Sequence, residues 1–215
     1  MNTHKFSEEL FLKVPIIGIV RGMPFDTIKN LLSVYANAGL TTIEITMNTN
    51  GAADMIKFIA DNFSGRLNIG AGTVCTQAEL DSALNAGAQF IVTPVVNQKI
   101  IECCVNAAIP IFPGAFTPTE IYNAWEMGAY MVKVFPATQF GPAYIKEVKA
   151  PLNKVKLVPT GGITLENIDE YKKAGADGYG MAGALFDKAL IEQQNWTGLK
   201  AHMKQFADKF QVTAK

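Results

Sequence analysis

Short apolar runs alternate with amphipathic stretches along the chain from residue 14 onward. The apolar runs are rich in β-branched and aromatic residues and too short for buried helices, so each predicts a strand. The expected strands are 14–20, 42–46, 67–71, 90–93, 110–112, 130–135, 156–160 and 178–181.

Amphipathic segments between these strands predict helices. The main ones are 27–37, 52–62, 77–85, 98–107, 118–127, 142–149 and 165–173. Strands that are hydrophobic on both faces and alternate with helices indicate a parallel sheet covered by helices. In a chain of 215 residues this α/β pattern best fits a (β/α)8 TIM barrel. No linker or break in composition suggests a second domain. Residues 1–215 are therefore expected to form a single barrel domain with a short N-terminal helix and a C-terminal helix.

A motif of small residue, glycine and apolar residue precedes every second predicted strand. Each glycine suits the left-handed position that ends a helix. Side chains inside a barrel form layers contributed by alternate strands, so equal offsets from these glycines predict one inward-facing layer. The glycines are Gly39, Gly87, Gly128 and Gly175, and the layer five residues on is Glu44, Val92, Lys133 and Gly180.

Lys133 lies inside the apolar run Tyr-Met-Val-Lys-Val-Phe at 130–135. A buried ammonium without a partner is so unfavourable that its pKa falls, and a neutral amine is a nucleophile that forms Schiff bases with ketones. With Glu44 in the same layer to move protons, an apolar pocket could run this chemistry on a keto acid. The alternative is a buried Lys133–Glu44 ion pair that only fills the barrel.

The composition excludes several other functions. Lys plus Arg and Asp plus Glu both number 19, so no basic excess exists to bind nucleic acid. Neither a leader nor a membrane span is recognisable, which makes the cytoplasm the expected location. The three cysteines form no C-x-x-C pair, and the two histidines are His4 in the N-terminal tail and His202 in the predicted last helix. A histidine triad and a multi-histidine zinc site are excluded, and no metal or cofactor is expected.

Glycine-rich loops follow the last two strands, Thr160-Gly161-Gly162 after one and Gly183 after the other. In barrels, backbone N–H groups of these two loops often bind phosphate, although glycines there also form plain tight turns. Arg21 follows the first strand and places a permanent cation at the same rim, where it holds a carboxylate or remains solvated.

Six short motifs lie in order along residues 12–190. They are I-E-I-T around Glu44, G-A-G-T-V at 70–74, T-P at 93–94, F-P-G at 112–114, V-K-V-F-P-A at 132–137 and T-G-G-I at 160–163. Together they resemble the 2-keto-3-deoxy-6-phosphogluconate (KDPG) and 4-hydroxy-2-oxoglutarate (KHG) aldolases. The resemblance implies a metal-independent class I aldolase on a (β/α)8 barrel, usually a homotrimer, that releases pyruvate from a small keto acid.

The resemblance also implies roles for individual residues. Lys133 matches the Schiff-base lysine and Glu44 the general acid/base. Further matches line the pocket or form the substrate and phosphate loop; these are Thr73, Pro94, Phe135, Thr160, Gly161 and Gly162.

Two positions depart from the KDPG pattern. Asn48 stands where that branch commonly has an arginine for the pyruvate carboxylate, and Gly183 stands where a serine usually meets the phosphate. The branch resembling 2-keto-3-deoxy-6-phosphogalactonate (KDPGal) aldolase tolerates Asn there and carries an Arg-Gly pair like Arg21-Gly22. Arg21 is therefore the expected carboxylate ligand, and an unphosphorylated keto acid remains open as the substrate. Two other functions also remain open: a phosphate-binding barrel isomerase or synthase, and a non-catalytic metabolite-binding barrel.

Overall fold

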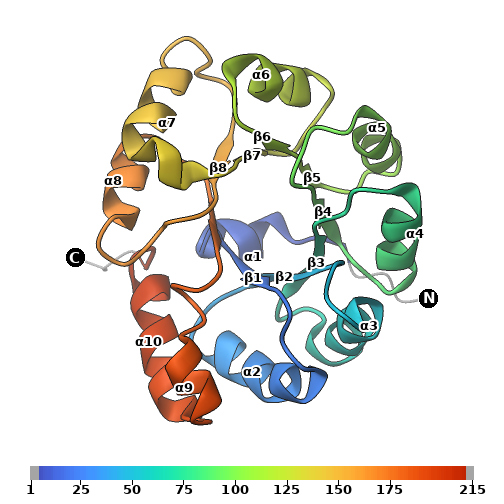
Figure 1. Ribbon diagram of the computed structural model, residues 1–215, viewed down its shortest axis with the longest axis vertical. Coiled ribbons are helices and arrows are strands. Elements are labelled where there is room, and N and C mark those ends of the chain that lie inside the picture. The colour runs from blue at the N-terminus through green and yellow to red at the C-terminus, as the bar shows by residue number, and fades with distance from the viewer. Residues whose placement is uncertain (1–4, 212–215) are drawn as a thin grey trace.

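The computed structural model describes residues 5–211, so His4 lies outside the described residues. Strands and helices alternate along this part of the chain, and the helices surround the strands (Figure 1). The strands are β1 (Ile16–Val20), β2 (Thr42–Thr46), β3 (Asn68–Gly72), β4 (Phe90–Val92), β5 (Ile111–Phe112), β6 (Gly114–Ala115), β7 (Val132–Val134), β8 (Leu157–Pro159) and β9 (Tyr179–Met181).

The helices occupy the predicted segments, with two short additions. They are α1 (Glu8–Lys13), α2 (Phe25–Asn37), α3 (Ala52–Phe63), α4 (Gln77–Asn85), α5 (Gln98–Asn106), α6 (Pro118–Glu126), α7 (Gly141–Lys149), α8 (Ile168–Lys173), α9 (Lys188–Glu192) and α10 (Trp196–Asp208), with a 3₁₀ turn η1 (Ala137–Gln139). The sequence pattern did not predict α9 or the 3₁₀ turn. His202 lies in α10, as expected for the last helix.

All strand pairings are parallel and form two sheets. The larger sheet is curled, with the order β5-β4-β3-β2-β1-β9, and the smaller has the order β6-β7-β8. Pro113 separates β5 from β6, because a proline has no N–H to donate to a sheet ladder. At the other junction, Thr160 forms an isolated parallel bridge with Gly180 of β9. The predicted strand 110–112 is thus confirmed as β5, β6 was not predicted, and the observed fold is a parallel α/β structure.

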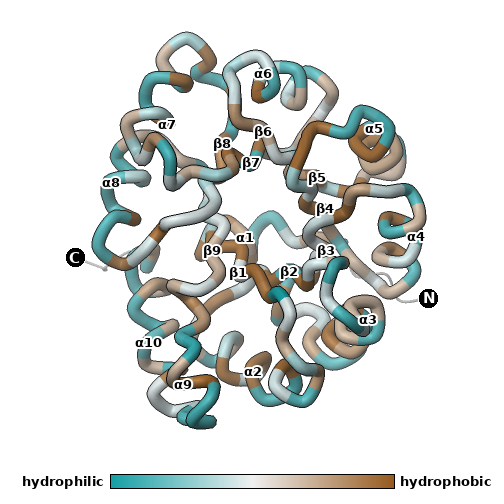
Figure 2. Tube along the Cα trace, viewed as in Figure 1, coloured by the Kyte–Doolittle hydropathy of each residue, from teal (hydrophilic) through white to brown (hydrophobic). Residues whose placement is uncertain are grey.

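Each strand buries both faces in different surroundings. Outward residues such as Ile16 and Ile91 join the large cluster between strands and helices, whereas their neighbours Ile17 and Phe90 join a smaller cluster on the inner side of the strands. This explains why the strands read as continuous apolar runs. In Figure 2, hydrophobic residues concentrate on the strands and hydrophilic ones on the outer helices.

Helix α1 covers one end of the space inside the strands (Figure 1). Its Phe11 is fully buried in the inner cluster. Asn68 anchors the start of this helix, accepting a hydrogen bond from Ser7 N at 2.7 Å and donating one to Ser7 O at 2.8 Å. Because this end is closed, any site that reaches the interior opens at the opposite end, where the strands finish.

The predicted left-handed glycines are confirmed. All four have φ between 91° and 98° directly after a helix, a conformation that residues with a Cβ rarely adopt. They are Gly39, Gly87, Gly128 and Gly175.

Candidate active site

Glu44 and Lys133 both point into the space enclosed by the strands. Lys133 is in register with Val158, which belongs to the inner cluster, and register partners in a parallel ladder share a face. Glu44 lies two residues after Thr42, whose register partner Ile17 is also in the inner cluster. The prediction that these two side chains face inward is confirmed, and both are buried, at 1% exposure for Glu44 and 6% for Lys133.

The two groups are not an ion pair. No described residue lies within 4.0 Å of the Lys133 ammonium as a salt-bridge partner. The carboxylate oxygen Oε2 of Glu44 is buried and has no hydrogen-bond partner among residues 5–211. An orphaned buried oxygen is costly unless a bound molecule satisfies it. The geometry therefore contradicts the buried ion pair that only fills the barrel.

Burial perturbs both groups toward their neutral forms. It raises the pKa of Glu44 from 4.5 to about 7, although the positive charges of Lys133 and Arg21 oppose the shift. It also lowers the pKa of Lys133, and the charge of Arg21 lowers it further while Glu44 acts in the opposite direction. A buried lysine with a lowered pKa is a better nucleophile at neutral pH, and a carboxyl group near pH 7 can both accept and donate a proton.

Glycines make the space that these side chains occupy. A Cβ at Gly72 of β3 would overlap the carboxylate of Glu44. A Cβ at Gly180 of β9 would overlap the hydroxyl of Thr160 in the same way. The second glycine of the G-A-G run of β3 is thus explained by the room that Glu44 needs, and the first, Gly70, by the ring of Phe90, which a Cβ there would overlap.

The residues expected to line the pocket lie where the strands end. The Phe135 ring centroid is 4.9 Å from Lys133 Nζ, and this side chain is 37% exposed. Thr73 directly follows β3 and has φ 56°, one of three non-glycine residues in the described chain with a left-handed backbone. Such strain clusters at functional sites. Pro94 is half-buried, and its carbonyl lies so close to Gly114 that a Cβ there would overlap it.

The expected phosphate loop follows β8. Thr160 is 5% exposed and lies beside β9, whereas Gly161 and Gly162 have φ of 97° and 72° and require glycine. Gly183 follows β9 and is exposed, and a Cβ there would meet no heavy atom of the described residues within 4 Å. This loop therefore has open space beside it.

Arg21 and Asn48 lie exposed at the same rim. Arg21 has no ion-pair partner among residues 5–211, and its charge acts on both Glu44 and Lys133. Asn48 instead lines a neighbouring cavity of about 380 Å³. The arrangement gives Arg21, and not Asn48, the electrostatic connection to the buried pair.

Sequence reasoning missed Thr49. Its hydroxyl accepts a hydrogen bond from Gly22 N at 3.0 Å and lies 3.0 Å from the hydroxyl of Thr46. Both threonines are buried, so this pair ties the loop after β2 to the loop that carries Arg21. The sequence signal was a threonine close behind the glutamate strand, but nothing in it indicated a partner 27 residues away.

Within residues 5–211, no group of three or more His, Cys, Asp or Glu side chains is placed to hold a metal ion. None of the helices in that range is long and apolar enough to cross a membrane.

Comparison with known proteins places the chain in a family. The model of the KDPG and KHG aldolase family matches residues 8–202, so the chain belongs to that family. The 2-dehydro-3-deoxy-6-phosphogalactonate aldolase of Escherichia coli (strain K12) is 32% identical over 93% of this chain and 98% of its own. The 2-dehydro-3-deoxy-phosphogluconate aldolase of Haemophilus influenzae is 36% identical over 91% of both chains.

A solved structure is similar in fold as well as sequence. The KDPG aldolase from Legionella pneumophila, with pyruvate captured as a covalent carbinolamine intermediate, has a TM-score of 0.84 and 25% identity. The alignment covers 91% of this chain and 95% of that one.

Proposed function

We propose that this protein is a class I aldolase that reversibly cleaves a 2-keto-4-hydroxy acid to pyruvate and an aldehyde. One observation carries the proposal: the buried Lys133 has no ion-pair partner among residues 5–211 and shares the interior with the buried Glu44, whose Oε2 has no hydrogen-bond partner in the same range. Membership of the family supports it and argues against a barrel isomerase or a non-catalytic barrel.

The proposed reaction begins when neutral Lys133 attacks the keto carbon. Loss of water from the carbinolamine gives an iminium ion, which serves as an electron sink. Glu44 takes the proton from the C4 hydroxyl, directly or through water, as the C3–C4 bond breaks and the aldehyde leaves. The resulting enamine is protonated at C3, and hydrolysis of the new iminium releases pyruvate and restores the amine.

We assign the carboxylate of the keto acid to Arg21, because its charge already reaches the buried pair. Asn48 lies further along the rim and can donate a hydrogen bond to a substrate hydroxyl. Thr73, Pro94 and Phe135 line the pocket around the reacting carbons.

The loops after β8 and β9 take the distal end of the substrate. Thr160, Gly161 and Gly162 offer backbone N–H groups to a phosphate, but Gly183 contributes no hydroxyl. The relatives act on phosphorylated gluconate and galactonate derivatives by name. For this chain the proposed substrate class is therefore 2-keto-3-deoxy acids, with the phosphate held by backbone groups alone.

We further propose that the two sheets together form a (β/α)8 barrel. The bridge between Thr160 and Gly180 and the short break at Pro113 support closure at both junctions. One domain over residues 1–215 and a cytoplasmic location remain proposals that follow from the sequence pattern. A homotrimer and independence of metals and cofactors remain proposals that follow from the family resemblance.

Pyruvate release from phosphorylated and unphosphorylated 2-keto-3-deoxy acids tests this function. Wild type should turn over at least one of them and Lys133→Met none. The control Lys156→Met, at a half-buried lysine outside the proposed site, should match wild type. If Lys133→Met retained activity, the Schiff-base mechanism would be wrong. If wild type released no pyruvate from the whole set, the assignment as an aldolase would be wrong.

A further inference from the structure

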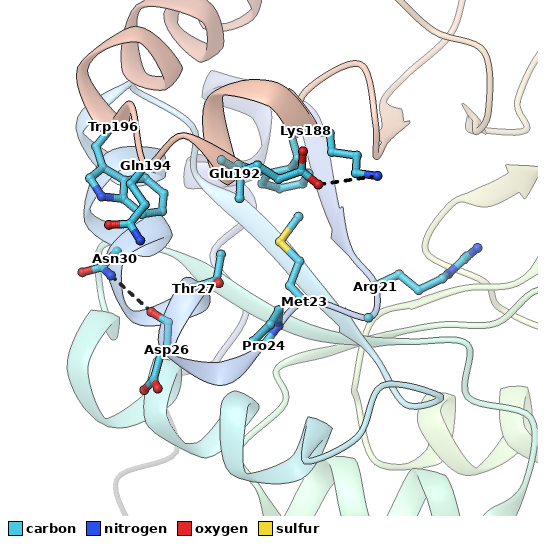
Figure 3. A pocket seen from close by; sticks show the side chains of 13 residues that line it. Arg21, Met23, Pro24, Asp26, Thr27, Asn30, Lys188, Glu192, Gln194 and Trp196 are labelled. Atoms are coloured by element: carbon cyan, nitrogen blue, oxygen red, sulfur yellow. Dashed lines mark hydrogen bonds and ion pairs between the residues drawn. The ribbon is translucent and has the colours of Figure 1, made fainter.

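A cleft distinct from the buried pair lies between α2 and the α9–α10 segment (Figure 3). Its volume is about 620 Å³, within the range of roughly 300–1,000 Å³ that is typical of small-molecule sites. Neither Lys133 nor Glu44 lines it, and nothing in the proposed aldolase reaction uses its far end.

One wall of the cleft is apolar. Phe186 is buried, and Met23, Ile191 and Trp196 are half-buried along the cleft. Trp196 begins α10, directly after a turn in which Gln194 has a left-handed φ of 52°. An indole ring beside aliphatic side chains is a surface on which an apolar or aromatic body packs well.

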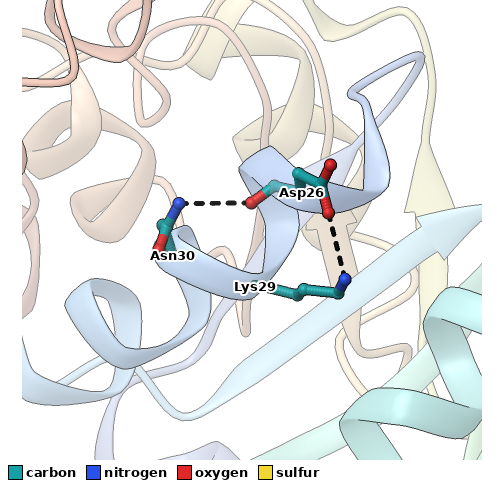
Figure 4. A network of polar contacts seen from close by, with 3 residues as sticks. All are labelled: Asp26, Lys29 and Asn30. Atoms are coloured by element: carbon teal, nitrogen blue, oxygen red, sulfur yellow. Dashed lines mark hydrogen bonds and ion pairs between the residues drawn. The ribbon is translucent and has the colours of Figure 1, made fainter.

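The charged residues of the cleft are compensated except for one. The Asp26 carboxylate is paired with Lys29 at 3.0 Å, and the Asp26 carbonyl accepts a hydrogen bond from Asn30 (Figure 4). Lys188 lies 3.6 Å from the Glu192 carboxylate. Arg21 is the lining residue whose charge no side chain among residues 5–211 balances in an ion pair. The cleft therefore complements a single negative charge.

Arg21 connects the cleft to the buried pair. Its backbone is held in place because the next residue, Gly22, donates its N–H to Thr49. In Figure 3 its side chain extends away from Gln194 and Trp196, which lie at the opposite end of the cleft. The same guanidinium acts electrostatically on Lys133 and Glu44. An anion bound from the cleft side would therefore compete with the carboxylate of the keto acid for the Arg21 guanidinium.

We propose that this cleft binds a small aromatic or apolar carboxylate. The exposed Arg21 side chain turns toward the cleft to pair with the ligand's charge, and the body of the ligand lies against Met23 and Ile191, on the side that leads to Trp196. This ligand competes with the carboxylate of the keto acid for Arg21 and so inhibits Schiff-base formation. The binding site stands on the cleft itself, whereas the competition rests on the proposed aldolase function. By thermodynamic linkage, saturating pyruvate in turn weakens the binding of the carboxylate ligand in the cleft.

Tryptophan fluorescence tests the binding site. The chain has two tryptophans, so a Trp125→Phe background leaves Trp196 as the only reporter. Titration with 3-phenylpropanoate should give a saturable signal with a dissociation constant of about 1 mM, and the neutral 3-phenylpropanamide should bind at least about tenfold more weakly because it lacks the charge.

Two variants locate the charge. Arg21→Gln should weaken 3-phenylpropanoate about tenfold. Thr27→Asp places a carboxylate in the cleft at the first turn of α2, where an acidic residue is tolerated, and should weaken binding to a similar degree. Thr27→Asn, whose side chain has the shape of aspartate but no charge, should not weaken it. No saturable signal, or equal affinity for acid and amide, would overturn the binding site. Unchanged affinity in Arg21→Gln or Thr27→Asp would overturn it as well.

Borohydride trapping of pyruvate tests the competition. At low pyruvate, 3-phenylpropanoate at ten times its dissociation constant should slow trapping about tenfold, and saturating pyruvate should remove the effect. Thr27→Asp should trap pyruvate normally and lose this inhibition. Fluorescence binding without inhibition would overturn the competition for Arg21. If wild type trapped no pyruvate at all, the proposed aldolase function would be wrong. The fluorescence titration would still show whether the cleft binds 3-phenylpropanoate.

Discussion

Replacing Glu44 with glutamine should stabilise the protein at alkaline pH while it removes most of the activity. Burial raises the pKa of Glu44 from 4.5 to about 7. Between these two values the folded state keeps a proton that the unfolded chain releases, so folding becomes less favourable as the pH rises. The difference in pKa corresponds to about 3 kcal/mol. This destabilisation is absent below pH 4.5, grows between pH 4.5 and about pH 7, and is complete above pH 7.

Thermal unfolding of wild type and Glu44→Gln at pH 5 and pH 8 measures this effect. A buried amide carries its own desolvation cost of roughly 1–3 kcal/mol, but that cost does not change with pH. The stability difference between wild type and Glu44→Gln therefore changes from pH 5 to pH 8 only through the charge of Glu44. For a domain of this size, 3 kcal/mol corresponds to about 6–12 °C in the unfolding midpoint.

The same comparison in a Lys133→Met background is the control for the neighbouring lysine. There the pKa of Glu44 should be higher still, because the charge that opposes the shift is gone. The alkaline advantage of Glu44→Gln should therefore persist in that background. In the background that retains Lys133, the activity of Glu44→Gln should fall about 10²–10⁴-fold because the proton acceptor is lost. A difference in stability that stays constant from pH 5 to pH 8 would refute the reasoning.

Three further substitutions address the rim and the packing around Glu44. Thr49→Val should weaken pyruvate binding about tenfold, with little change in kcat, because the loop that carries Arg21 loses its hydrogen bond to Thr49. In a double-mutant cycle with Arg21→Ala, the two losses of binding free energy should be less than additive. Full additivity would show that Thr49 does not act through Arg21. Gly72→Ala should lower kcat about 100-fold and stability by about 1–3 kcal/mol, because the methyl group displaces the Glu44 carboxylate; wild-type turnover in this variant would contradict the placement of Glu44. Gly183→Ser enters open space and should lower the KM for a phosphorylated substrate about fivefold, the worth of about one hydrogen bond, and leave its unphosphorylated analogue unchanged. An equal change for both analogues would mean that this loop does not face the phosphate.

The alternation of apolar runs and amphipathic segments was enough to predict most of the fold. The strand 42–46 and the helix 77–85 were predicted with their observed ends. Such agreement arises because a strand buried on both faces must be apolar throughout, and because capping boxes and left-handed glycines mark where helices begin and end. The pattern failed beyond Pro113, where the short strand β6 follows the expected strand 110–112 and was not predicted.

The fourfold glycine repeat was enough to bring the two central side chains of the site together. Equal offsets from Gly39 and Gly128 predicted that Glu44 and Lys133 face inward, and the strand registers confirm it. An offset of this kind fixes which face a residue occupies, because strand geometry has a period of two. The link from Thr49 to the loop of Arg21 depends on how two loops fold against each other, which no local period encodes.

The cleft beside Arg21 was equally invisible in the sequence. It depends on α9, a five-residue helix that the pattern did not predict, and on the turn at Gln194. Helices this short have too few residues for a recognisable hydrophobic period, so their position is set by tertiary contacts.

Mass spectrometry after incubation with pyruvate and borohydride tests the central claim most directly. Reduction of the iminium would fix one pyruvate-derived group irreversibly on the peptide that contains Lys133. The Schiff-base mechanism predicts one adduct per chain in wild type, none in Lys133→Met, and the wild-type amount in Lys156→Met. No adduct in wild type, or an equal adduct in Lys133→Met, would contradict it.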